Sequence, residues 1–150
     1  MRRAGALVAV LLVVLLVLLC ACTTRAGSPA GESAWREQAD KVLGAAMSSL
    51  GTARVVLEND TDLPHPYAVV TLQDAITSLH RESGSFLTSR PPDDRHTDND
   101  RVVAALGEAT TLLTRVSTAV AANAGTAALR ESVRKAYDDL DDLRTKVAGS

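Results

Sequence analysis

The densest group of potential metal ligands in this 150-residue chain lies in one short segment in its second half. The ligands alternate with other residues and are Asp94, His96, Asp98 and Asp100. Carboxylate oxygens on a loop suit Ca²⁺ or another divalent ion, but calcium loops need Gly at the sixth position and Glu at the twelfth. Counted from Asp94, those positions hold Asn99 and Ala105. We therefore favour a second interpretation, in which the acidic residues cap the following helix and complement its positive end.

The motifs of common enzymes do not occur in the sequence. It lacks Gly-x-Ser-x-Gly, Gly-x-Gly-x-x-Gly, the phosphate-binding loop and His-Glu-x-x-His. It also lacks Cys-x-x-Cys-His, which binds haem covalently, and Glu-x-x-His, which di-iron helical bundles use. We therefore expect a protein that is not an enzyme and has no cofactor.

The N-terminal segment has the layout of a signal peptide. Arg2 and Arg3 precede an uncharged run from Ala4 to Ala21. A membrane-spanning helix needs about 20 apolar residues, and this run is slightly shorter. An uncleaved membrane anchor is therefore the alternative to a cleaved signal.

The end of this segment, Leu19-Cys20-Ala21-Cys22, resembles the lipobox of bacterial lipoproteins. In that motif a Leu lies three residues before the modified Cys and a small residue lies directly before it. The resemblance covers residues 1–22 only. It implies that residues 1–21 are a lipoprotein signal peptide, that Cys22 is lipidated, and that the mature chain is anchored on the extracytoplasmic face of the cell membrane.

Residues 22–32 would then comprise the lipidated Cys22 and a flexible linker. Small residues dominate it, with Gly27, Pro29 and Gly31 among them. Ten such residues have a root-mean-square span of roughly 17 Å, so the domain would lie close to the membrane. Cleavage before Cys22 leaves no other Cys, so stability must come from packing without a disulfide.

From residue 33 to the end, apolar residues repeat every three or four positions, as in helices with one buried face. Pro and Gly divide this pattern into four segments. Polar residues interrupt these lines at Ser83 and Asn123. The repeating positions are Trp35, Ala39, Val42, Ala46, Leu50, Ala53 and Leu57; Val69, Leu72, Ile76, Leu79, Ser83 and Phe86; Val102, Leu106, Ala109, Leu113, Val116, Val120 and Asn123; and Leu129, Val133, Ala136, Leu140, Leu143 and Val147.

Short connections between such segments predict antiparallel neighbours. We therefore expect an all-α fold, in which residues 33–150 form an antiparallel up-down four-helix bundle after an N-terminal signal or anchor helix. The alternatives are an extended coiled coil, which the prolines would interrupt, and a helical repeat, for which the sequence shows no fixed period.

The first predicted helix has a second, outward stripe of small residues. At 100° per residue, Gly44, Ser48, Gly51 and Val55 lie opposite its apolar stripe. Glycine inside a helix costs about 1 kcal/mol relative to Ala, and a solvated face would normally have charged residues. We interpret the stripe as a seam that another helix approaches closely, and the alternative is that it only reflects tolerance to mutation.

The charge and composition exclude several classes of function. Sixteen basic and eighteen acidic residues leave no positive excess for binding nucleic acid, and 46% apolar residues are too many for a disordered chain. We therefore expect a membrane-anchored, extracytoplasmic lipoprotein that is a non-enzymatic interaction or scaffold module of the cell envelope. Its partner would be an envelope protein or a second copy. The alternative is a small-ligand or metal-binding module with its site between helices.

Overall fold

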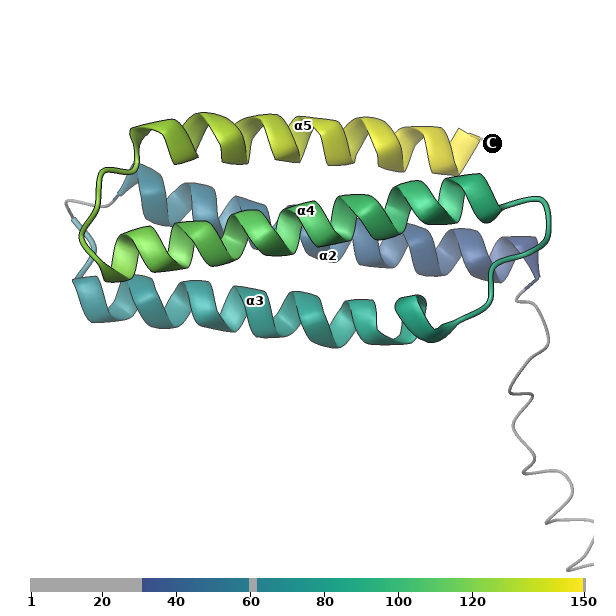
Figure 1. Ribbon diagram of the computed structural model, residues 1–150, viewed down its shortest axis with the longest axis horizontal. Coiled ribbons are helices and arrows are strands. Elements are labelled where there is room, and N and C mark those ends of the chain that lie inside the picture. The colour runs from purple at the N-terminus through teal and green to yellow at the C-terminus, as the bar shows by residue number, and fades with distance from the viewer. Residues whose placement is uncertain (1–30, 60–61, 150) are drawn as a thin grey trace, which may run out of the picture.

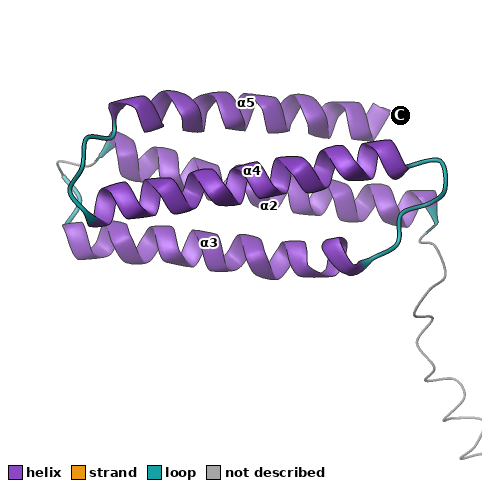
Figure 2. Ribbon diagram, viewed as in Figure 1, coloured by secondary structure: helices purple, strands orange, loops and turns teal. Residues whose placement is uncertain are grey.

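The computed structural model describes residues 31–59 and 62–149. These residues form four helices and no strand: α2 (Glu32–Glu58), α3 (His65–Thr88), α4 (His96–Ala121) and α5 (Ala127–Gly149) (Figure 2). The predicted all-α class is thus confirmed for this part of the chain. None of the described helices is long and apolar enough to span a membrane. The predicted signal or anchor helix and Cys22 lie outside the described residues.

The four helices lie side by side (Figure 1). The start of α2 lies at the same end as the connection between α3 and α4 and the C-terminal end of α5. We call this the proximal end. The opposite, distal end holds the α2–α3 and α4–α5 connections.

Proline and asparagine mark the distal helix boundaries. Pro64 precedes α3 and Pro66 lies in its first turn, where the missing backbone N–H would have no partner in the helix. Asn123 follows α4 with φ of 49°, a left-handed conformation that Asn tolerates better than most residues. Asn123 therefore marks the end of α4.

Helix α2 packs against each of the other three helices. All seven positions predicted for its apolar stripe are buried. Four further residues are buried beside the stripe because α2 has neighbours on more than one side: Leu43, Met47, Ser49 and Val56. The many Ala residues of the stripe allow these neighbours to approach closely.

Helix α5 is less embedded than α2. Its buried residues are seven apart, at Val133, Leu140 and Val147, and it packs mainly against α2 and less against α4. Two arginines link it to α2. Arg130 Nε donates to the Leu57 carbonyl oxygen at 2.9 Å, and Arg144 Nε donates to the Asp40 carboxylate at 2.6 Å. Most of the remaining residues of α5 are exposed, and many of them are charged.

Candidate functional site

The structure does not bring the four predicted metal ligands together. No three His, Cys, Asp or Glu side chains within residues 31–59 and 62–149 are placed to share a metal ion. Asp98 instead accepts hydrogen bonds from Arg95 Nη1 and Arg101 Nη1, each at 3.2 Å. His96 Nε2 lies 4.0 Å from a carboxylate oxygen of Asp93, outside this predicted set.

The acidic residues also do not cap α4 as predicted. Helix α4 begins at His96, its N-cap position is Arg95, and no side chain caps it. The expectation of capping oxygens is therefore wrong, because Asp98 and Asp100 lie inside the helix and Asp94, which precedes it, makes no cap hydrogen bond. Asp98 does lie in the first turn, where a negative charge complements the helix dipole.

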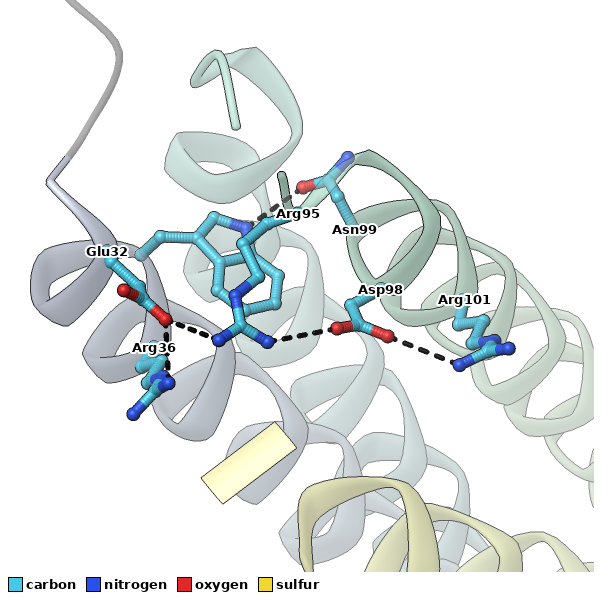
Figure 3. A network of polar contacts seen from close by, with 7 residues as sticks. Glu32, Arg36, Arg95, Asp98, Asn99 and Arg101 are labelled. Carbon is cyan, nitrogen blue, oxygen red and sulfur yellow. Dashed lines mark hydrogen bonds and ion pairs between the residues drawn. The ribbon is translucent and has the colours of Figure 1, made fainter. Parts of the chain in front are cut away.

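The largest polar network of the described residues centres on Arg95 at the proximal end (Figure 3). Its side chain is only 11% exposed and lies between two carboxylates, donating to Glu32 Oε1 and Asp98 Oδ2. The guanidinium lies 5.9 Å from the ring centroid of Trp35. Glu32 also accepts a 2.7 Å bond from Arg36.

Trp35 connects this network to the apolar core. Its indole Nε1 donates to Asn99 Oδ1 at 3.2 Å, and its ring centroid lies 6.5 Å from that of Phe86. The hydrogen bond from Arg95 and the charge of Arg36 lower the pKa of the Glu32 carboxyl, so it stays ionised. The network thus joins the first turn of α2 to the start of α4. Helix α2 begins at Glu32, one residue before the domain boundary predicted at residue 33.

Sequence reasoning missed Arg95 as a central residue. Its neighbours along the chain are acidic residues and a histidine, and this local context predicts a solvated loop. Its main partners, Glu32 and Trp35, are more than 55 positions away, and only tertiary packing brings them near. The geometry indicates a structural connection between helices, because each charged group is engaged by another.

The predicted seam does lie on the outer side of α2, but α5 covers part of it. Ser48 is exposed, Val55 is 55% exposed, and a Cβ on Gly51 would meet nothing within 4 Å. A Cβ on Gly44 would lie 3.9 Å from Cζ of Arg144, whose guanidinium binds Asp40 at 2.6 and 3.0 Å. The open part of the seam therefore runs from Ser48 to Val55.

A shallow groove of about 490 Å³ between α2 and α3 adjoins this open part. Ser48 lies on its α2 side, and Tyr67 and Val70 lie on its α3 side, 61% and 54% exposed. Small and hydroxyl-bearing residues line the rest: Ala45, Ser49, Thr52, Thr71, Ala75 and Ser78, with Asp74. The groove thus combines a floor without bulky side chains and an apolar rim.

A separate cavity of about 280 Å³ lies at the distal end. Val56, Ala68 and Val120 form apolar walls, and His65 and Asn123 contribute polar groups. The His65 Nε2 atom lies 2.9 Å from the Val120 carbonyl oxygen, so its N–H donates a hydrogen bond to that oxygen. Asn123, which the sequence pattern places on a core line, is exposed at this cavity instead.

No known protein family, curated protein or solved structure matches the chain.

Proposed function

We propose that the four helices form an antiparallel up-down four-helix bundle. Contacts between distant residues support this topology. Ser49 of α2 binds the Ala75 carbonyl oxygen of α3, and Lys41, earlier in α2, pairs with Glu82, later in α3. Residue numbers that rise in one helix while they fall in its neighbour are typical of antiparallel packing. The same reversal relates α2 to α5 in the Arg130 and Arg144 contacts.

We further propose that this bundle, residues 33–150, is the extracytoplasmic domain of a lipoprotein anchored to the cell membrane through Cys22. The lipobox resemblance and the small-residue linker of residues 22–32 support the anchor. The domain itself is a non-enzymatic interaction or scaffold module for an envelope protein. Because acidic residues outnumber basic ones, the lipid has to provide the affinity for the membrane.

The observation that carries the interaction role is the outer face of α2. Its open seam, from Ser48 to Val55, continues into the groove beside α3 with exposed Tyr67 and Val70. A helix of a partner can approach a small-residue surface closely, and the apolar rim would add buried area. Charged groups along the floor of such a contact would oppose burial, and only Asp74 is charged among the groove residues.

The anchor is tested by replacing the modified residue. Cys22→Ala should abolish the lipid mass and either release the chain from the membrane fraction or block its processing. Mass spectrometry and fractionation of the host envelope measure both effects. An unchanged chain that itself has the full-length mass without lipid, and is retained in the membrane as the Cys22→Ala variant is, would contradict lipidation and favour the uncleaved anchor.

The interaction face is tested with a bulky side chain on the open seam. Gly51→Leu should fold, because a Cβ there meets no atom within 4 Å, and should lose the co-purifying partner. Ser132→Leu, at an exposed position of α5, is the matched control and should keep the partner. Native mass of the chain purified from its own envelope in mild detergent is the measurement. Equal partner recovery from both variants would refute the seam.

The distal cavity favours a second candidate function, binding of a small ligand. Apolar walls with a few converging polar groups are typical of ligand sites, and 280 Å³ lies just below their usual volume. A bound ligand would appear as a stoichiometric added mass on the purified chain. Ala68→Leu should fill the cavity and remove that mass, and an added mass that persists in this variant would place the ligand elsewhere.

A further inference from the structure

The outer side of α4 has an uncharged stripe that none of the other described helices covers. Its residues are exposed and spaced by three or four positions: Val103, Gly107, Thr111, Thr114 and Thr118. We call them the neutral stripe. Between residues 102 and 121 only Glu108 and Arg115 are charged. Glu108 lies beside α5, and Arg115 is exposed at one edge of the stripe, four residues after Thr111.

The threonines of the neutral stripe already use their hydrogen-bond donors. Thr111, Thr114 and Thr118 each donate from Oγ1 to the backbone carbonyl four residues earlier, at 2.9 Å. Leaving a donor unsatisfied on burial costs about 1–3 kcal/mol, and these hydroxyls avoid that cost. The stripe can therefore be covered by another protein surface without providing new partners for its donors.

A groove of about 490 Å³ between α3 and α4 adjoins the proximal part of the stripe. Leu106 forms part of its lining and is buried, while Leu87 and Val103 at its edge are 52% and 37% exposed. A Cβ on Gly107 would meet no atom within 4 Å, so the groove is open there. One face thus holds both projecting apolar side chains and a slot, the combination that self-complementary contacts use.

The proposed lipid anchor restricts how two copies can meet. If each chain is attached near the start of α2, neighbouring copies in one membrane stand with their helices parallel and their proximal ends level. A two-fold axis parallel to the helices then keeps equivalent residues at the same height and places those nearest the axis opposite their own equivalents. A charged residue on the axis would face a like charge, which costs several kcal/mol, whereas the neutral stripe itself has no charged residue and Arg115 lies to one side of it.

We propose that the neutral stripe and the α3–α4 groove bind a second copy of this chain, side by side and parallel. This inference rests on the lipid anchor of the proposed function. The stripe is about 22 Å long, and two adjacent helices are about 20 Å wide, which gives roughly 450 Å² of projected contact per copy. Such a contact is small for a stable dimer, but attachment to one membrane raises the local concentration of copies.

Opposite charges at Thr114 test this arrangement. Thr114→Lys and Thr114→Glu place a like-charged pair across the two-fold axis, and each should weaken self-association by about 100-fold or more. Lys and Glu favour helix more than Thr does, so neither change should unfold α4. A mixture of the two variants should form dimers again. Thr145→Lys, at an exposed position of α5, is the matched control and should dimerise like the unchanged chain.

The measurement is the native mass of the full lipidated chain in mild detergent, together with disulfide formation by Thr114→Cys in the intact membrane. The expected results are a dimer of the unchanged chain, monomers of each charged variant, and a mixed dimer. Monomers of the unchanged chain without the Thr114→Cys disulfide would overturn the proposal. So would a dimer that tolerates both charges, or a different protein bound at this face.

The lipid mass and the membrane fraction report on the anchor separately. A chain without lipid would overturn the anchor even if it dimerised, and a lipidated monomer without the Thr114→Cys disulfide would overturn the dimer alone.

Discussion

Truncation of Trp35 should be among the most destabilising single changes in the domain. Its side chain is fully buried at the proximal end, where it packs against Phe86 and binds Asn99. Trp35→Ala removes roughly 200 Å² of buried apolar surface, equivalent to about 5 kcal/mol at 25 cal/mol per Å². Truncations of this kind cost about 3–5 kcal/mol, and we expect about 4 kcal/mol. A domain of this size is stable by only about 5–15 kcal/mol.

Two further variants separate the contributions to this loss. Trp35→Phe keeps an aromatic ring but loses the hydrogen bond to Asn99 and some volume, so we expect about 1.5 kcal/mol. Tyr67→Ala is the matched control, because Tyr67 is 61% exposed and should change stability by no more than about 0.5 kcal/mol.

Urea unfolding followed by far-ultraviolet circular dichroism suits all three variants, because Trp35 is the only tryptophan and fluorescence would lose its reporter. A cost below about 1 kcal/mol for Trp35→Ala would refute the reasoning, since no well-packed aromatic core residue behaves in that way. Equal costs for the Ala and Phe variants would show that ring packing is not the main contribution.

Three other predictions concern α2 and the distal end. The hydrogen bond from Arg144 lowers the pKa of Asp40, so the pair should stabilise the fold above about pH 4 and lose this effect as the pH falls through the lowered pKa. Because both groups are half exposed, Asp40→Asn should cost only about 0.5 kcal/mol at pH 7, and urea unfolding should show the difference from the unchanged chain vanishing in acid. Gly51→Ala should stabilise α2 by about 1 kcal/mol in thermal unfolding, since a Cβ there has open space, and destabilisation would show an unseen contact. Asn123→Gly should preserve stability whereas Asn123→Val should lower it by about 1–2 kcal/mol, and equal melting temperatures would argue against the left-handed conformation.

The helices and their buried stripes were predictable because they depend on local spacing. The inward positions of α2 and α4 repeat every three or four residues, and every apolar position named for these two helices is buried. Pro64 and Asn123 mark helix boundaries through their own backbone preferences, which need no tertiary context. The part of the seam from Ser48 to Val55 lies on the outer side of α2 for the same reason.

The candidate site was less predictable. The predicted metal ligands do not come together, because Asp98 instead pairs with Arg95 and Arg101 near the start of α4. Cover of Gly44 by Arg144 depends on a helix 100 residues further along the chain, and the spacing of residues within α2 has no information about it. The distal cavity likewise depends on how His65, at the start of α3, and Asn123, just after α4, come to line the same space.

The sequence by itself determined which residues form helices, which side of each helix is apolar, and where the chain turns. These properties follow from the 3.6-residue period and from the backbone preferences of Pro, Gly and Asn. Only the tertiary structure decided which faces are covered, that α2 is central, that Arg95 joins α2 to α4, and that the neutral stripe of α4 is left open. Such properties depend on how whole helices pack against one another, because a contact needs two surfaces that are distant in the sequence.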